Sequence, residues 1–406
     1  MGENKLIPMR RFKEYSKVWH MFSLDEVYKN IKNAFVGTAT PYYVESGHFY
    51  LQSNNVKNGK INKNVKVYIN NEFYKKQENN WLRTGDIVMV QSGHIGHTAV
   101  IEENLDKTVA HALIMFQGKK EKLDSNFLNN QFQTKDMKQK LEKMAIGNTI
   151  KHILSSDMKK FNVYLTTLSE QQKIGEFFKV LDERIANQER KIAKVKDLKS
   201  AYLTEMFPQE GETIPKRRFK GFKGKWHKKT LGDFGTVEMN KRIFKEQTSI
   251  IGDVPFYKIG TFGKQADAFI SYELFNEYKT KYPYPNPGDI LISAAGSIGR
   301  TVAYQGENAY YQDSNIVWLK HDGKLSNLFL KQFYKFTNWS SLEGSTIKRL
   351  YNRDILEAII HIPSSIKEQQ KIGEFFKNLD NQIETEEKKL DKLQKMKEAY
   401  LEEMFV

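Results

Sequence analysis

One long segment of this chain occurs twice. Residues 170–207 read EQQKIGEFFKVLDERIANQERKIAKVKDLKSAYLTEMF, and residues 368–405 read EQQKIGEFFKNLDNQIETEEKKLDKLQKMKEAYLEEMF. Of the 38 aligned positions 23 are identical, which is more than chance or shared helix composition would give. A segment held this constant within one chain is expected to meet the same kind of partner twice.

Both copies carry the apolar spacing of a long helix. Counted from Ile174 and from Ile372, stripe positions recur at alternating spacings of four and three residues for about four heptads, which is the a/d pattern of a coiled coil. About 36 helical residues make a rod of about 54 Å. The alternative is that each helix packs along its own domain as ordinary core.

The connection between the copies determines how such helices would pair. Residues 208–215 (PQEGETIP) form a short polar linker with a proline at each end. A second domain must therefore start near the far end of the first helix. Because the second helix begins where that domain ends, it can pair along the first helix only by running back antiparallel.

Shorter segments recur outside the helices. Residues 84–101 (TGDIVMVQSGHIGHTAVI) match residues 287–304 (PGDILISAAGSIGRTVAY), and both predict a turn, an apolar strand, a Gly-x-x-Gly turn and a second strand. Residues 147–157 (GNTIKHILSSD) match residues 344–354 (GSTIKRLYNRD). The predicted order is therefore domain, helix, domain, helix, on a common frame.

Composition limits what the remaining sequence can be. The inserts at residues 33–81 and 241–282 do not align usefully with each other. A chain of 406 residues with 39% hydrophobic side chains can form two ordinary cores. No apolar run approaches the length of a membrane span, and the N-terminus lacks the apolar core of a signal peptide. The absence of cysteine excludes disulfides and thiolate chemistry. We therefore expect a cytoplasmic protein.

The charge of the chain indicates a polyanionic partner. The formal net charge is +15, and residues 216–229 contain eight Lys and Arg side chains and no acid, interleaved with Phe219, Phe222 and Trp226. Lys and Arg bind phosphates with little regard for sequence, whereas polar side chains on the inserts can reach base edges. A solvated basic surface without nucleic acid is the alternative.

Catalytic motifs are missing from the sequence. It contains no Gly-rich phosphate loop ending in Lys-Ser/Thr, no His-Glu-x-x-His and no Gly-x-Ser-x-Gly. His94 and His97 have the spacing of a metal pair, but the matching positions in the second half are Ser297 and Arg300. Turn residues or DNA contacts are the better interpretation, and we expect neither catalysis nor a metal site.

These parts together resemble the specificity subunit of type I restriction-modification enzymes over essentially the whole chain. The resemblance rests on the twin EQQKIGEFF segments, the twin Gly-Asn/Ser-Thr-Ile-Lys segments and the paired Gly-Asp-Ile…Gly-x-Ile-Gly strands. It implies an α+β fold in which an antiparallel two-helix coiled coil separates two pseudo-twofold-related mixed α/β target recognition domains. The recognition domains are expected at residues 1–168 and 208–366, and the spacer helices at residues 169–207 and 367–406.

The resemblance also implies a mechanism. In that family each recognition domain reads one half of a split DNA site, and the paired helices set the gap and dock two methyltransferase subunits. Motor-nuclease subunits complete the restriction enzyme. The chain itself is then a non-catalytic subunit without a cofactor, and S-adenosylmethionine, ATP and Mg²⁺ are implied for the partner subunits.

Candidate DNA contacts lie in the turns and inserts. In the first half they are Lys57, Lys60, Asn62, Lys63, Gln91, Ser92, His94, His97 and Lys151. In the second half they are Lys241, Arg242, Lys264, Gln265, Ser293, Ser297, Arg300, Lys348, Arg349 and Asn352. The alternative for each of these residues is simple exposure to solvent.

The identical faces at the start of the two helices are candidate docking sites for two copies of one methyltransferase. They consist of Gln171, Gln172, Lys173, Glu176, Phe177 and Phe178, and of Gln369, Gln370, Lys371, Glu374, Phe375 and Phe376. Phe177 and Phe375 lie off the a/d stripe, so either a partner or a widened helix seam must cover them.

Two other functions stay open. A stand-alone sequence-specific DNA-binding regulator would bind DNA tightly without partners. A structural coiled-coil adaptor would show no salt-sensitive affinity for DNA.

Overall fold

Two compact units make up the chain. The computed structural model describes residues 6–147, 151–209, 211–337, 339 and 349–406. The first unit consists of residues 1–189 and 388–406, and the second unit of residues 190–387. Two long helices, α6 (Leu168–Met206) and α10 (Ile366–Met404), each give one half to either unit. The helix ends lie within two residues of the predicted spacer boundaries, and the division into functional domains stays a prediction.

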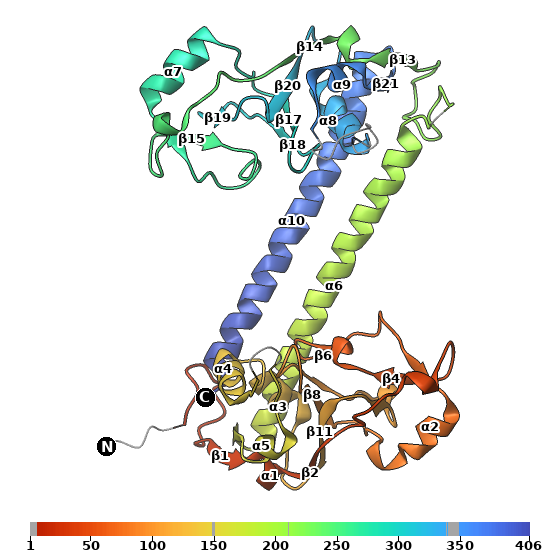
Figure 1. Cartoon of the computed structure of the whole chain (residues 1–406), viewed down its shortest axis with the longest axis vertical. Coiled ribbons are helices and arrows are strands. Elements are labelled where there is room, and N and C mark those ends of the chain that lie inside the picture. The colour runs from red at the N-terminus through yellow and green to blue at the C-terminus, as the bar shows by residue number, and fades with distance from the viewer. Residues whose placement is uncertain (1–5, 148–150, 210, 338, 340–348) are drawn as a thin grey trace. The chain divides into compact units, whose positions relative to one another are not determined.

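Each unit combines strands with short helices, so the predicted α+β class is confirmed (Figure 1). The elements of the first unit before α6 are β1 (His20–Ser23), α1 (Leu24–Val27), β2 (Tyr28–Asn33), η1 (Thr40–Tyr42), β3 (Tyr43–Val44), β4 (His48–Leu51), η2 (Ser53–Asn55), β5 (Val56–Lys57), β6 (Lys60–Ile61), β7 (Tyr68–Ile69), α2 (Asn71–Lys76), η3 (Glu78–Asn80), β8 (Ile87–Val90), β9 (Thr98–Val100), η4 (Glu103–Leu105), β10 (Val109–Ala110), β11 (Leu113–Lys119), α3 (Ser125–Gln131), α4 (Lys135–Met144), α5 (Ser155–Lys159) and β12 (Asn162–Leu165). Those of the second unit before α10 are β13 (His227–Thr230), η5 (Leu231–Asp233), β14 (Gly235–Glu238), η6 (Lys245–Gln247), β15 (Val254–Tyr257), β16 (Phe269–Ile270), α7 (Tyr272–Lys281), β17 (Ile290–Ser293), β18 (Thr301–Ala303), β19 (Tyr310–Tyr311), β20 (Ile316–His321), α8 (Asn327–Phe336), α9 (Asn352–Glu357) and β21 (Ile359–Ile362).

The central sheets of the two units have the same strand order. In the first unit the order is β2-β11-β8-β9, and in the second it is β14-β20-β17-β18, with all neighbours antiparallel. A two-stranded sheet lies beside each, β1-β12 and β13-β21. The strand, turn and strand predicted for residues 84–101 and 287–304 are confirmed as β8–β9 and β17–β18.

The inserts share a topology although their sequences do not align. In the first unit β4 pairs with β10 in parallel and with β7 antiparallel. In the second unit β15 pairs in the same way with β19 and β16. A helix follows in both, and its first turn is capped by the side chain of Asn70 or of Ser271. Strand pairing uses backbone groups, so the same topology needs few shared side chains.

Each core contains residues from the start of one long helix and the end of the other. In the first unit Trp19 lies 5.3 Å from Phe127 and 6.1 Å from Phe405, measured between ring centroids. In the second unit Trp226 lies 5.9 Å from Phe207 and 5.7 Å from Phe329. A buried Phe side chain contributes about 1.5–3 kcal/mol, so Phe405 holds the end of α10 to the first core and Phe207 holds the end of α6 to the second.

The helix halves pair antiparallel within the first unit. Phe177 of α6 meets Tyr400 of α10, with 5.1 Å between the ring centroids, whereas Asp182 meets Lys397, with 2.7 Å between Oδ1 and Nζ. Residue numbers therefore rise along one helix in the direction in which they fall along the other.

The second unit repeats this pairing with the helices exchanged. Tyr202 of α6 meets Phe375 of α10 at 5.0 Å, and Lys199 meets Asp380, with 2.5 Å between Nζ and Oδ1. The predicted antiparallel direction is therefore confirmed in each unit. Lys199 and Lys397 occupy the same position in the two copies of the repeat, and each pairs with an aspartate of the opposite helix.

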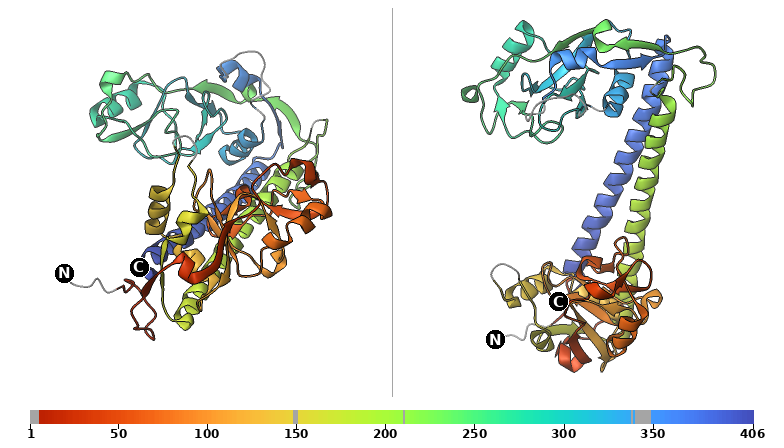
Figure 2. Two further views of the ribbon diagram at one scale, coloured as in Figure 1. Left: turned by 60° about the horizontal axis from the view of Figure 1, so that its bottom comes forward. Right: turned by 45° about the vertical axis from the view of Figure 1, so that its right-hand side comes forward.

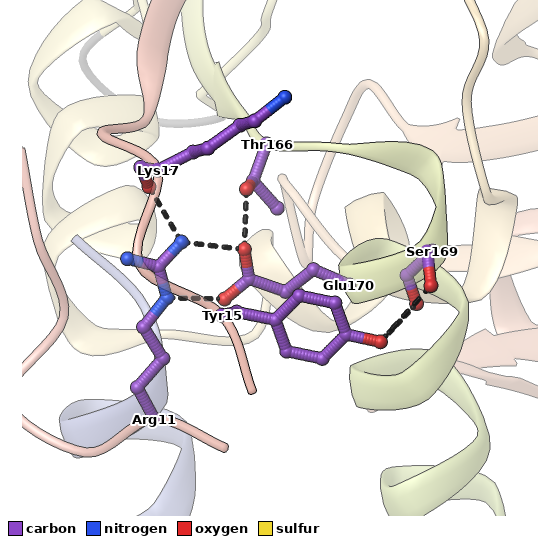
Figure 3. A network of polar contacts seen from close by, with 6 residues as sticks. All are labelled: Arg11, Tyr15, Lys17, Thr166, Ser169 and Glu170. Carbon is purple, nitrogen blue, oxygen red and sulfur yellow. Dashed lines mark hydrogen bonds and ion pairs between the residues drawn. The ribbon is translucent and has the colours of Figure 1, made fainter. Parts of the chain in front are cut away.

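A buried ion pair holds the start of each long helix (Figure 3). Arg11 Nε and Nη2 donate to the two carboxylate oxygens of Glu170, each at 2.6 Å, and the Glu170 side chain is fully buried. Thr166 donates a further hydrogen bond to this carboxylate, and the Tyr15 hydroxyl lies 3.0 Å from Ser169 Oγ. Two parallel N–H···O bonds fix the planes of both groups, so the helix start has one orientation on its unit.

The second unit has the same pair. Arg218 Nε and Nη2 donate to Glu368 at 2.6 and 2.8 Å, and the glutamate is again buried. The residue before each arginine contacts the end of the opposite long helix through its backbone: Arg10 N–H donates to Glu403 O at 2.7 Å, and Arg217 N–H to Glu205 O at 2.9 Å. In Figure 2 the red segment near the start of the chain lies close to the end marked C. Two neighbouring arginines thus join both helices in each unit.

A glutamine and a glycine complete the attachment. Buried Gln171 accepts from Asp124 N–H and donates to Thr166 O, and Gln369 accepts from Ser326 N–H at 2.9 Å. Gly175 and Gly373 allow the helix to approach α3 and α8. A Cβ at Gly373 would lie 2.5 Å from Leu328 Cβ and 2.9 Å from Phe329 N.

Within the described part of the chain, no helix has the length and apolarity needed to span a bilayer.

Replacing Gly373 with alanine should destabilise the second unit by about 2 kcal/mol, because overpacking against the backbone of α8 outweighs the better helix propensity of alanine. Thermal unfolding of the full chain measures this. Gln370→Ala, at an exposed position of the same helix, should leave the melting temperature nearly unchanged. An unchanged or higher melting temperature for Gly373→Ala would contradict the close approach.

Candidate nucleic-acid interface

In the first unit, polar turns gather on the side of the central sheet where β8 ends and β11 begins. We call this side of the sheet the first edge. β8 ends and β11 begins side by side, with Val90 paired to Leu113, so residues 91–97 and 110–112 leave the sheet together. The segment around His152 joins them, because His152 bridges to Ser92 and Ile153 N–H donates to Gln91 O at 2.9 Å.

The β5–β6 hairpin packs against this edge. Gly59 bridges to Ala99, and the backbone N–H of Asn58 donates to His97 Nδ1 at 3.3 Å. The hairpin turn is Asn58-Gly59, with φ of 50° and 82°, the left-handed conformation that two-residue hairpin turns require. The fold therefore brings Lys57 of the insert to the turn that carries His94 and His97.

The surroundings of His97 at this edge favour its neutral form. Burial lowers its pKa below the usual value, and the neighbouring His94, Lys138 and Lys57 lower the pKa further. Because Nδ1 accepts the bond from Asn58, the ring hydrogen is assigned to Nε2. A neutral imidazole with a donor Nε2–H suits an acceptor on a base edge or a phosphate oxygen.

A polar cavity lies behind the hairpin. Its volume is about 530 Å³, and its lining includes Lys60, Lys138, Asp182 and Lys397. Lys60 Nζ lies 3.0 Å from Asp182 Oδ1, so this candidate DNA contact is turned toward α6. Lys138 belongs to α4 and lies close enough to His97 to affect its pKa.

The second unit has a corresponding edge, here called the second edge. β17 ends where β20 begins, with Ser293 paired to Ile316, and Leu350 N–H donates to Ala294 O at 2.8 Å. Both units have a residue with positive φ shortly before the equivalent strands β11 and β20. It is Ala112 (51°), directly before β11, and Ser314 (60°), two residues before β20. The two edges are thus built alike.

Arginines dominate the second edge. Arg242 Nε donates to Asp313 Oδ2 at 2.8 Å, Arg300 Nη1 to Phe262 O at 3.0 Å, and Arg349 Nη2 to Ser314 O at 2.8 Å. The loop with Lys264 and Gln265 lies next to Arg300, since a Cβ at Gly263 would be 4.0 Å from Arg300 Cδ. The two edges therefore share a frame but present different chemistry.

Most predicted DNA contacts are accessible, and three are not where we expected them. Ser293 is buried, and its hydroxyl donates to Ser297 O and accepts from Arg300 N–H at 2.9 Å, so its prediction as a DNA contact is wrong. Asn62 and Lys63 lie beyond β6, and Lys63 Nζ donates to Asn104 Oδ1 in η4, the helix that follows β9. The structure therefore does not bring Asn62 and Lys63 to the first edge.

The other predicted contacts divide by exposure. Those exposed to solvent are Lys57, Lys60, His94, Lys151, Lys241, Arg242, Lys264, Gln265, Ser297, Arg349 and Asn352. Those half-buried are Gln91, Ser92, His97 and Arg300. Lys348 lies outside the described residues.

Sequence reasoning missed three residues of these edges. Asn58 carried a signal, because an Asn-Gly pair flanked by lysines is typical of a hairpin turn. Lys138 and Asp313 carried none, because their positions depend on contacts between segments far apart in the chain. Among the described residues no three His, Asp or Glu side chains are grouped as metal ligands would be.

Burial removes four residues from the predicted docking faces. Gln171, Phe178, Gln369 and Phe376 are at most 2% exposed, so the prediction that these side chains contact a partner is wrong. Their repetition follows from their internal contacts instead.

Phe177 and Phe375 belong to a widened helix seam. Phe177 meets Tyr400 and Phe12 with ring centroids 5.1 and 6.0 Å apart, and Phe375 makes the equivalent contacts in the second unit. Lys173 and Lys371 lie over the rings of residues 12 and 219.

A smaller repeated surface remains exposed. Its members are identical in the two helices and lie at spacings of four and three residues, on one helix face. We call this surface the docking ridge, and it consists of Gln172, Glu176 and Lys179 on α6 and of Gln370, Glu374 and Lys377 on α10.

Comparisons with known proteins agree on one family. The model of the family described as "Type I restriction modification DNA specificity domain" matches residues 17–197 and 223–395. A putative type I restriction enzyme specificity subunit from Haemophilus influenzae is 57% identical over 157 residues, which cover 38% of this chain and 40% of that protein. A putative type I specificity subunit from Mycoplasma genitalium is 26% identical over 127 residues, 31% of this chain and 33% of that protein. Both relatives are therefore matched over well under two thirds of their length.

Solved structures show the same fold over nearly the whole chain. The S subunit of a type I restriction-modification system from M. genitalium has a TM-score of 0.66 at 17% identity and covers 99% of both chains. A chain from a study of complex assembly and conformational transition of the type I R-M system has a TM-score of 0.54 at 17% identity, covering 95% of this chain and 97% of that one.

The pKa of His97 provides a test of the first edge. Lys138→Ala should raise this pKa toward about 6.5, because it removes a nearby cation. Since the folded pKa is lowered, the stabilisation from neutral His97 is present above pH of about 6.5 and is lost as the pH falls through the folded value. An NMR titration of the histidine ring protons measures this, and Lys135→Ala is the matched control on the same helix. An unchanged His97 pKa in Lys138→Ala would place α4 away from this edge.

Proposed function

The chain belongs to the family of type I restriction-modification DNA specificity domains, and we propose that it reads a two-part, asymmetric DNA site and holds two methyltransferase subunits. Its first edge would read one half-site and its second edge the other. The paired helices would set the gap between them.

The observation that carries this proposal is that the two edges have the same strand arrangement but present different side chains. Both edges are formed by equivalent strands of two central sheets that have the same strand order. The first presents Lys57, His94 and His97, whereas the second presents Arg242 and Arg300. Because base readout depends on the donors and acceptors that side chains present, two unlike edges are expected to read two unlike sequences.

The net charge supports a DNA partner. Neutralisation of phosphates by Lys and Arg makes DNA binding strong and salt-dependent, and the chain has a formal net charge of +15. Exposed cations such as Lys151 and Lys241 are suited to phosphate contacts, which position the edges without reading sequence.

The docking ridge supports a paired partner. Neither core packing nor the helix seam explains why its exposed residues are identical in α6 and α10. Two equal ridges suit two copies of one protein, which we propose are the methyltransferase subunits. The motor-nuclease subunits would join through them, in the cytoplasm.

Catalysis is assigned to those partners. The methyltransferase would bind S-adenosylmethionine, and the motor-nuclease subunits would bind ATP and Mg²⁺. The chain's own part is to place the two half-sites relative to the docked subunits.

Methylome sequencing tests the proposed function. Cells that express the chain with methyltransferase subunits of a type I system should methylate one asymmetric site made of two short sequences and a fixed gap. Methylation of a single uninterrupted sequence would contradict it. Tight, specific DNA binding by the purified chain alone, without any methylation, would instead favour a stand-alone regulator.

Charge reversal on the docking ridge tests the assembly. Glu176→Lys and Glu374→Lys should each reduce the number of bound methyltransferase subunits from two to one, and the double variant should bind none, because each places a like charge beside Lys179 or Lys377. Native mass spectrometry of the co-purified complex gives the count. The control is Glu183→Lys, an exposed and unrepeated position of α6 that should keep both subunits. Two subunits on the double variant would rule the ridge out.

A further inference from the structure

Arg242 is held in place by a carboxylate. It follows β14 at the second edge, its side chain is 60% exposed, and its Nε donates to Asp313 Oδ2 at 2.8 Å. The Asp313 side chain is only 14% exposed. The guanidinium is therefore fixed at its inner side and open to solvent at its outer side.

The loop that carries Asp313 is itself fixed. Asn315 N–H donates to Asp313 O at 2.6 Å, and Asn315 O accepts from Ala294 N–H at 2.8 Å, which ties the loop to the end of β17. Ser314 adopts a φ of 60° and donates its hydroxyl to Asp313 Oδ2 at 3.3 Å. Asp313 thus has little freedom, and part of the entropy cost of ordering Arg242 is met before DNA binds.

Arg242 differs from the other arginines of the second edge in what it leaves available. Arg300 uses Nη1 on Phe262 O, and Arg349 uses Nη2 on Ser314 O. In the described structure the one hydrogen bond of Arg242 is made by Nε. Its Nη1 and Nη2 groups therefore remain as a complete two-pronged donor.

That donor fits guanine better than phosphate. A guanidinium fork matches the O6 and N7 acceptors of guanine in the major groove, the commonest specific contact between protein and DNA. A phosphate next to Arg242 would also meet the negative charge of Asp313, whereas a base edge carries no net charge. The carboxylate therefore disfavours phosphate at this position relative to a base.

We propose that Arg242 reads a guanine in the half-site of the second unit, with Asp313 as the positioning residue. The inference rests on the proposed function and adds one base to it. At the matching place in the first unit, the segment after β2 and the loop before β11 bring together Phe35 and His111, and His111 Nε2 lies 3.1 Å from Gly37 O. The guanidinium contact is therefore particular to the second half-site.

Selection from a randomised DNA duplex library tests this. The full chain is assembled with its methyltransferase subunits, and bound duplexes are sequenced for the unchanged chain and for Arg242→Ala, Asp313→Ala and Asp313→Asn. Arg353→Ala is the matched control, because it removes an exposed arginine of the same unit, paired with Glu357. The other half-site of each selected duplex serves as an internal control.

In the unchanged complex one position of the second half-site should be a G·C pair. Arg242→Ala should reduce the preference for that pair by about tenfold or more, within the usual range for a bidentate contact, and leave the other positions unchanged. Asp313→Ala should weaken the same position. Asp313→Asn should retain most of the preference, because its amide oxygen still accepts from Nε. An aspartate with a merely structural role would not explain a loss and recovery confined to one base position.

Three results would overturn the inference. Arg242→Ala could instead weaken binding to all sequences equally and lower the slope of log affinity against log salt concentration by about one. That result would make Arg242 a phosphate contact. A selected two-part site in which no G·C pair responds to Arg242→Ala would refute guanine reading and leave the proposed function intact. Failure of the unchanged complex to select a two-part site would refute both.

Discussion

The buried pair of an arginine and a glutamate at the start of each long helix is the interaction on which the rest of the structure depends. The carboxylates of Glu170 and Glu368 are almost completely excluded from water, and each receives two hydrogen bonds from one guanidinium. Removing one partner of such a pair typically costs about 3–5 kcal/mol, because a charge is left buried alone. The pair therefore fixes each helix half to its own sheet, and with it the direction in which the edge of that sheet faces relative to the helix.

This attachment changes the meaning of the internal repeat. Its constancy first suggested a demand for two equal docking faces. Most of the repeated motif instead serves the fold: the glutamate pairs with arginine, the first glutamine joins the helix to α3 or α8, the glycine permits their close approach, and the second phenylalanine is core. The docking ridge is what remains after those roles are removed. A smaller surface with no internal function is a stronger candidate for a partner than the whole motif.

The sequence predicted what depends on local pattern. Heptad spacing gave the long helices, the linker prolines and chain connectivity gave their antiparallel direction, and the Gly-x-x-Gly segments gave β8–β9 and β17–β18. It did not predict contacts between distant segments. Asn58 beside His97 and Arg242 beside Asp313 each join parts of the chain that only the fold brings together. The common topology of the inserts was also hidden, because backbone pairing conserves strand order without conserving side chains. Ser293 was misjudged because a serine at a strand end looks the same in sequence whether it faces solvent or closes its own turn.

We propose that the repeated residues attach a DNA-reading domain and that the unrepeated residues determine what it reads. A chain in which residues 213–362 replace residues 6–165 tests this most directly. In that chain Arg217 and Arg218 take the place of Arg10 and Arg11, so each unit keeps its two neighbouring arginines. Methylome sequencing of cells expressing that chain with the methyltransferase subunits should give a site composed of two copies of the second half-site. A folded, assembled complex of that chain that still methylates the original first half-site would contradict this.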